Sequence, residues 1–133
     1  MGPAMSPVIV SFDEPDLAGA VERLPREAVD ALPFGAIRLD AAGVVRFYSA
    51  AEARLSGSDA RARLGIDFFT AVAPCMDTAE YRGRIERARR DGQVDIEFGW
   101  VGDFADAERF LRVRIQSTRD GDGGVWIFML RED

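Results

Sequence analysis

The chain has no histidine and no lysine among its 133 residues, so all 17 of its basic residues are arginines. Without histidine it cannot supply the base of a Ser-His-Asp or Cys-His catalytic pair, a histidine ligand for zinc or haem, or a phosphorylated histidine. Without lysine it cannot form the Schiff base through which retinal or pyridoxal phosphate is held. The absence of these residue types excludes several large classes of enzyme and sensor.

Cysteine is almost absent as well. Cys75 is the only one, which permits neither an internal disulfide nor a metal site built from several cysteines. A lone cysteine is most often a small buried hydrophobe, and a reactive one needs a lowered thiol pKa. Pro74 interrupts regular structure directly before it, which places Cys75 in a loop or at a helix start and favours a reachable thiol. We expect any covalent chemistry of this chain to run through Cys75.

Long apolar runs and excess positive charge are also lacking. No run approaches the roughly 20 apolar residues that cross a bilayer, and residues 1–10 carry no basic region followed by an apolar stretch, as a secretion signal would. The net charge of −6 argues against general nucleic-acid binding. Because 133 residues that are 47% hydrophobic suit one domain, the sequence predicts a single cytoplasmic domain without membrane insertion.

Helical and extended patterns follow one another in blocks along the chain. Residues 12–32 contain two short helical patterns separated by Pro25. The rest predicts strands at 34–39 and 44–48, short helical pieces between 49 and 73, a helix at 78–90, and strands at 94–101, 110–117 and 125–130. Because the strands group around the helices instead of alternating with them, we expect an α+β domain with an antiparallel sheet.

The first helical segment is expected to lie outside the sheet. Residues 1–32 are predicted to form an N-terminal helical cap within the same domain, and residues 33–133 its core. Three large aromatic residues take alternate positions along the later strands, namely Phe110, Trp126 and Phe128. This alternation predicts that they belong to the hydrophobic core.

Tyr48 and Glu52 are the first candidate pair for a functional site. They lie four residues apart at a predicted strand-to-helix junction, so both side chains can point at one pocket. The alternative is structural, because Ser49 to Glu52 has the capping-box pattern, in which Ser49 caps the helix and Glu52 returns to the backbone of the cap residue. Spacing alone favours this cap over a site. Ser56, one turn later, is by default a hydroxyl at the end of a helix.

Several stretches of the sequence have a distinctive combination of residues and spacing. They are Leu32 to Asp40 (LPFGAIRLD), Tyr48 to Glu52 (YSAAE), Gly65 to Phe69 (GIDFF) followed by Val72 to Cys75 (VAPC), and Val125 to Phe128 (VWIF). Together they resemble the photoactive yellow protein family, blue-light sensors with a PAS fold. The resemblance runs from about Asp13 to Leu130, and the VAPC run with Tyr48 and Glu52 upstream is its most distinctive part. It implies a central five-stranded antiparallel sheet flanked by helices, with an N-terminal helical cap.

The resemblance also implies a pigment site. Cys75 would carry 4-hydroxycinnamic acid (p-coumaric acid) as a thioester, and Tyr48 and Glu52 would hydrogen-bond its buried phenolate oxygen. Ser56 stands where the family has a threonine that supports the tyrosine. Glu52 would be protonated, because burial beside a negative phenolate raises the pKa of a carboxyl. The expected pocket residues are Ser58, Phe68, Phe69, Pro74 and Phe98.

The function that the resemblance implies is a photocycle, so the chain is not expected to be an enzyme. Light would isomerise the pigment from trans to cis, and a proton would then move from Glu52 to the pigment. The buried carboxylate left behind is costly and would drive partial unfolding, with residues 12–32 as the segment released. The signal would pass to a downstream signalling protein or domain, for which a histidine kinase is the candidate.

Three other functions stay open on the residues alone. A PAS interaction or redox-sensing module would leave Cys75 unmodified and bind a partner through its sheet. A flavin-binding PAS sensor would need an Asn-Cys-Arg-Phe-Leu run around its reactive cysteine, which this sequence lacks. An enzyme with Cys75 as nucleophile would need a base, and no histidine is available. Colour separates the pigmented sensor from all three.

The sequence departs from the family pattern in two places, and the second departure predicts a slow return to the dark state. Ser58 stands where the family often has an arginine that shields the phenolate, and residues 102–108 lack the methionine that assists recovery in the family. We therefore expect the absorption of an illuminated, pigmented sample to recover slowly in darkness. Recovery within milliseconds at neutral pH, followed by flash absorption spectroscopy, would contradict this prediction.

Overall fold

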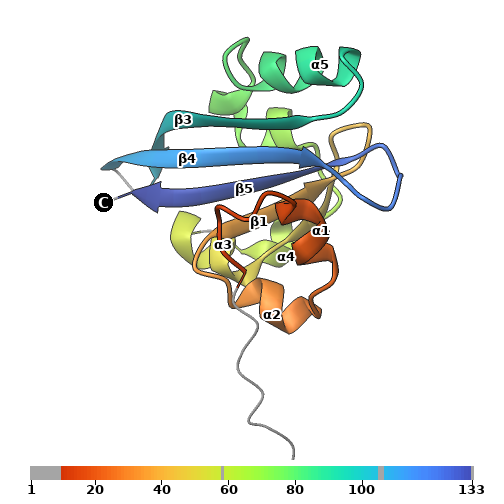
Figure 1. Cartoon of the computed structure of the whole chain (residues 1–133). Coiled ribbons are helices and arrows are strands. Elements are labelled where there is room, and N and C mark those ends of the chain that lie inside the picture. The colour runs from red at the N-terminus through yellow and green to blue at the C-terminus, as the bar shows by residue number, and fades with distance from the viewer. Residues whose placement is uncertain (1–9, 58, 105–106, 133) are drawn as a thin grey trace, which may run out of the picture.

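A five-stranded antiparallel sheet forms the centre of the molecule (Figure 1). The computed structural model describes residues 10–57, 59–104 and 107–132. The strands are β1 (Gly35–Leu39), β2 (Val45–Tyr48), β3 (Asp95–Phe104), β4 (Ala107–Ser117) and β5 (Val125–Glu132), in the spatial order β2-β1-β5-β4-β3. Every neighbouring pair is antiparallel, so the predicted α+β class is confirmed.

The helices precede the sheet or lie between β2 and β3 in the chain. They are α1 (Leu17–Glu22), α2 (Arg26–Asp30), α3 (Ala50–Ser56), α4 (Ala60–Arg63), the π-helical turn η1 (Phe68–Val72), the 3₁₀ turn η2 (Pro74–Met76) and α5 (Arg82–Arg90). None of the helices in the described ranges combines the length and apolarity that crossing a bilayer requires. The structure confirms the two predicted N-terminal helices, α1 and α2, and the short helical pieces before Cys75.

Two predicted boundaries are wrong, both in the second half of the chain. The helix predicted from Thr78 begins at Arg82, because residues 78–81 form a turn in which the Thr78 hydroxyl accepts a hydrogen bond from the Tyr81 amide at 3.2 Å. Residues 102–108 lie between the predicted strands 94–101 and 110–117, but β3 and β4 extend into this segment and remain paired in register as far as Phe104 and Ala107. Backbone pairing continues along a hairpin although the side chains there carry no strand signal.

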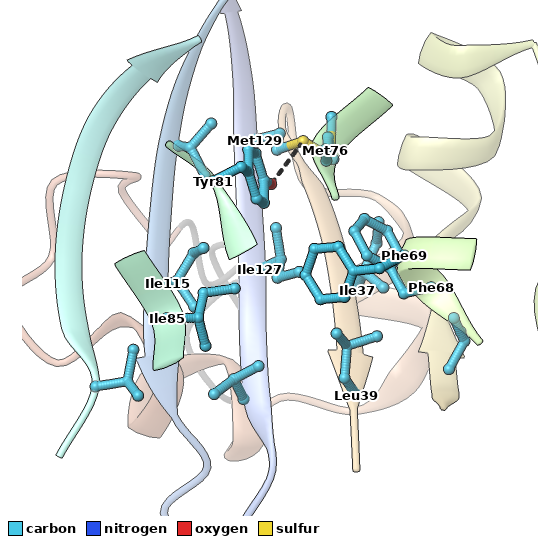
Figure 2. Packing of buried hydrophobic residues seen from close by; sticks show 14 of the residues in the cluster. Ile37, Leu39, Phe68, Phe69, Met76, Tyr81, Ile85, Ile115, Ile127 and Met129 are labelled. Atoms are coloured by element: carbon cyan, nitrogen blue, oxygen red, sulfur yellow. Dashed lines mark hydrogen bonds between the residues drawn. The ribbon is translucent and has the colours of Figure 1, made fainter. Parts of the chain in front are cut away.

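Two hydrophobic clusters lie on opposite faces of the sheet, because successive side chains of a strand point to opposite sides. One face carries Ile37, Ile115 and Ile127, which pack under Phe68 and Tyr81 (Figure 2). Tyr81 is fully buried, and its hydroxyl donates a hydrogen bond to the Met129 sulfur at 3.7 Å. This face supports the segments that lead to Cys75.

The other face of the sheet packs against α1 and α2. Leu17 and Val21 from α1 meet Phe34, Trp126 and Phe128 in this second cluster. The predicted burial of Trp126 and Phe128 is confirmed, but Phe110 is 64% exposed and does not belong to the core. It lies near the far end of the β3–β4 hairpin, opposite Val101, where alternation alone does not bury a side chain.

Polar side chains of β4 also hold the N-terminal segment. Gln116 is fully buried, and its carbonyl oxygen accepts a hydrogen bond from the Ala18 amide at 2.7 Å. Its amide nitrogen donates to the carbonyl of Pro15 at 2.9 Å. Arg114 donates to the carbonyls of Phe12 and Glu14, both at 2.6 Å. The start of α1 and the residues before it are therefore bound to the sheet through their backbone.

We predict that Gln116→Leu destabilises the folded protein by about 1–3 kcal/mol, because the buried Ala18 amide would lose the acceptor of its hydrogen bond. The matched control is Arg119→Ala, which removes a partly exposed ion pair with Asp16 and should cost less than about 1 kcal/mol. Urea unfolding of both variants measures the difference. Equal midpoints would show that Gln116 does not anchor this segment.

Candidate functional site

A cavity of about 240 Å³ lies beside α3 and the η1–η2 segment. Its polar lining residues come from four places in the chain: Tyr48 ends β2, Glu52 and Ser56 belong to α3, Arg63 ends α4, and Cys75 belongs to η2. Apolar residues complete the wall, among them Ile37, Phe68, Met76 and Met129. The fold thus brings together the predicted cysteine, tyrosine, glutamate and serine.

A more open groove of about 710 Å³ lies on the opposite face, beside α1, α2 and Trp126. Three of its charged groups are paired with one another, since Arg38 binds Asp120 and Asp122. It also contains no thiol, and its openness leaves it poorly shielded from water. The smaller cavity, with buried polar groups and a cysteine, is the better candidate for a functional site.

Tyr48 and Ser56 form a hydroxyl pair in the wall of the cavity. Tyr48 is only 4% exposed, and its hydroxyl oxygen lies 3.1 Å from the Ser56 hydroxyl, with either group able to donate. The Ser56 hydroxyl also lies 2.7 Å from the carbonyl oxygen of Glu52, to which it donates. Because Ser56 gives its one hydroxyl proton to this carbonyl, it accepts a hydrogen bond from Tyr48 in this arrangement, and a ligand oxygen beside Tyr48 would take the place of Ser56 as the acceptor of the tyrosine O–H.

The Glu52 side chain does not form the expected half of a capping box. Ser49 caps α3 as predicted, accepting a hydrogen bond from the Glu52 amide at 3.0 Å. The reciprocal half of the capping box is missing, because the Ser49 amide donates to the Ala36 carbonyl of β1 at 2.9 Å. The Glu52 side chain is therefore not needed at the helix start. The structural interpretation that spacing favoured is wrong for this side chain.

The Glu52 carboxyl is buried and faces the guanidinium of Arg131. It is 1% exposed, and its two oxygens lie 3.2 Å and 3.4 Å from the two terminal nitrogens of Arg131 on β5. Burial raises the pKa of Glu52 above its ordinary value, and Arg131 opposes that rise. A side chain at Gly35 would overlap Oε1 of Glu52, so only glycine leaves room for this carboxyl on β1.

Cys75 does not follow the usual habit of a lone cysteine. It is exposed, although it also lines the cavity, so its thiol stands where the cavity meets solvent. Pro74 begins the 3₁₀ turn that carries it, as Pro often does at the start of a helical turn. The sequence prediction of a reachable cysteine is confirmed.

Within the described ranges, no group of three metal-ligating side chains is present.

Sequence reasoning missed the two arginines of this site. Arg63 lines the cavity, and its Nε is buried without a hydrogen-bond partner in the described part of the chain. Arg131 reaches Glu52 from the last strand, 79 residues further along the chain. Neither position carries a motif, since Arg63 ends a short helix and Arg131 lies near the end of a strand whose earlier residues belong to the core. Only spatial proximity identifies them.

The predicted wall residues divide into three groups. Phe68 and Pro74 line the cavity. Phe69 and Phe98 are absent from its lining and pack edge-to-face against Tyr81, with ring centroids 6.3 Å and 5.2 Å away. Ser58 lies outside the described residues.

Comparison with known proteins gives a consistent picture. The family model described as the PAS fold matches residues 29–132. The photoactive yellow proteins of Rhodothalassium salexigens and Halochromatium salexigens are each 32% identical over 123 residues, which cover 92% of this chain and 98% of each relative. The crystal structure of the photoactive yellow protein domain from the sensor histidine kinase Ppr of Rhodospirillum centenum is 36% identical, with a TM-score of 0.78 over 84% of this chain and 97% of that one.

Proposed function

The chain belongs to the photoactive yellow protein family within the PAS fold, and on that premise we propose that it is a blue-light photoreceptor. Its pigment would be 4-hydroxycinnamic acid, bound as a thioester to Cys75. It would act as a sensor that changes its fold in light and does not turn over a substrate. One observation carries the proposal: a single cavity collects Cys75, Tyr48, Glu52 and Ser56 from separate parts of the chain.

The chemistry of the cavity suits this pigment. Its volume of about 240 Å³ is below the roughly 300–1,000 Å³ of pockets for drug-sized ligands, which favours a molecule with one ring over a flavin. The exposed Cys75 thiol can be acylated from solvent, and the buried Tyr48 and Glu52 offer hydrogen-bond donors for a phenolate oxygen. Once bound, the pigment supplies blue-light absorption and a double bond that isomerises from trans to cis.

Glu52 would be the proton donor of the photocycle. Burial raises its pKa, which favours the protonated carboxyl that can donate a hydrogen bond to a phenolate. After light absorption the Oε–H bond of Glu52 would break, and Glu52 would become a carboxylate inside the protein. A new charge in this position changes the interactions of β1, because Gly35 lies directly against the carboxyl.

The segment released in light would be the N-terminal cap, residues 12–32. In the described structure its apolar side chains share one cluster with Phe34 and Ala36, which border Gly35 on β1. The cap also contacts the helix of Glu52 directly, because the Asp30 carboxylate at the end of α2 accepts a hydrogen bond from the Ala50 amide at the start of α3 at 2.8 Å. Partial unfolding of the cap would be the signalling state, and residues 33–133 would remain as the sensor core.

A histidine kinase is the proposed receiver of the signal. The related domain of known structure comes from the sensor histidine kinase Ppr of Rhodospirillum centenum. A cytoplasmic location would place the sensor beside such a kinase or another downstream signalling protein.

A PAS interaction module with unmodified Cys75 is the second candidate. It is favoured by two exposed apolar side chains, Val101 and Phe110, which face each other across β3 and β4 and are 50% and 64% exposed. Such a pair can contribute to a contact with another protein. This candidate predicts that the protein takes up no pigment.

Absorption spectroscopy after reconstitution tests the main proposal. Wild-type protein and Cys75→Ala are incubated with an activated ester of 4-hydroxycinnamic acid, and spectra are recorded before and after blue light. We expect a yellow band in the wild type that bleaches in light and returns in darkness, with no band in the variant. Intact mass should rise by one acyl group on the wild type only. A colourless wild type would favour the interaction module.

Arg63 provides a second test of an anionic pigment. Its buried Nε in the cavity wall, which has no hydrogen-bond partner among the described residues, would stabilise a phenolate, so Arg63→Gln should raise the phenol pKa of the bound pigment by about one unit. The matched control is Arg61→Gln, an exposed arginine on the same helix that does not line the cavity. Titration of the visible band measures both. Equal pKa values in the two variants would remove Arg63 from the site.

A further inference from the structure

Arg131 forms a two-point ion pair with the buried Glu52. The guanidinium nitrogens Nη2 and Nη1 lie 3.2 Å and 3.4 Å from Oε2 and Oε1, so each carboxyl oxygen faces its own donor. The Arg131 side chain is 10% exposed and that of Glu52 is 1% exposed. The pair is therefore shielded from water. In such buried surroundings an arginine favours the carboxylate form of its partner much more strongly than it does at a surface.

Two opposed influences act on the Glu52 proton. Burial disfavours the charged carboxylate, whereas Arg131 favours it, and burial is the larger of the two. Other ionisable groups surround the same cavity or act on Glu52 from the elements around it: Tyr48 on β2, Arg63 on α4, Cys75 on η2 and Tyr81 before α5. In the described ranges, Arg131 is the cation in direct contact with Glu52.

We propose that Arg131 is the partner that holds the Glu52 carboxylate once Glu52 has given up its proton, and that it thereby sets the lifetime of the light-activated state. This inference rests on the proposed function. In the step concerned, the Oε–H bond of Glu52 breaks, the proton forms a bond with the phenolate oxygen of the pigment, and the electron pair stays on the carboxylate. No oxidant or other reactant is required.

The ion pair changes the expected cost of this step. An unpaired carboxylate in the interior is strongly unfavourable and would take its proton back quickly. With Arg131 already in place, the new charge has a cation and hydrogen-bond donors on both oxygens. Arg131 is a positioning residue in this scheme, because it acts on Glu52 and not on the pigment.

The first arm of the test uses the pigment-free protein. The pKa of Glu52 is measured by NMR titration of its side-chain carboxyl carbon in wild type, Arg131→Gln and Arg131→Lys. We expect Arg131→Gln to raise the pKa by about one unit or more, and Arg131→Lys to raise it less. Arg46→Gln is the control, because Arg46 pairs with Asp40 at the surface and should leave Glu52 unchanged. An unchanged Glu52 pKa in Arg131→Gln would overturn the inference.

The second arm uses the pigmented protein. Dark recovery of the visible band should be up to about tenfold faster in Arg131→Gln, since one pKa unit corresponds to a factor of ten between the two protonation states. Light-minus-dark infrared spectra, with Glu52→Gln as reference, report the loss of the protonated carboxyl. Unchanged or slower recovery in a pigmented Arg131→Gln would overturn the inference and leave the photoreceptor intact. A wild type without pigment would refute the proposed function instead, while the titration would still show whether Arg131 holds the carboxylate.

Discussion

A carboxyl group that is 1% exposed must be neutral or must have a cation beside it, because an isolated charge is too unfavourable inside a protein. Both influences act on Glu52, because burial favours its neutral form and Arg131 favours its carboxylate. Much of the neighbouring structure is arranged around this group. Gly35 leaves space for it on β1, and Ser49 caps α3 without its help. The cavity then presents the carboxyl to whatever it holds.

The central sheet connects this carboxyl to the N-terminal segment. Because side chains alternate along a strand, β5 contributes Met129 to the cavity wall and Trp126 and Phe128 to the opposite cluster. The N-terminal segment is held there by apolar packing and by its backbone hydrogen bonds to Gln116 and Arg114. A change of charge on one face of the sheet therefore acts on elements whose other face carries the cap. In the proposed photocycle, proton loss from Glu52 and release of the cap are two effects of one disturbance.

The local patterns that predicted the fold correctly are those with short-range causes. Pro25 separates α1 from α2, Ser49 caps α3, and Pro74 begins the turn that exposes Cys75. Predictions failed where distant contacts decide. Phe110 has the alternation of a core residue, yet nothing in the described structure covers it enough to bury it. Residues 102–108 lack strand propensity, but most of them pair because β3 and β4 continue as one hairpin.

For this protein, the sequence by itself determined the α+β class and the family resemblance, because both depend on residue identity and short-range pattern. The choice of Cys75, Tyr48, Glu52 and Ser56 as site residues followed from that resemblance. Tertiary structure alone decided that these residues share one cavity. It also decided that Glu52 meets Arg131 instead of completing a capping box. Spacing along a helix shows which groups can meet locally. It carries no information about a partner 79 residues away, because only the pairing of β1 with β5 brings that strand beside α3.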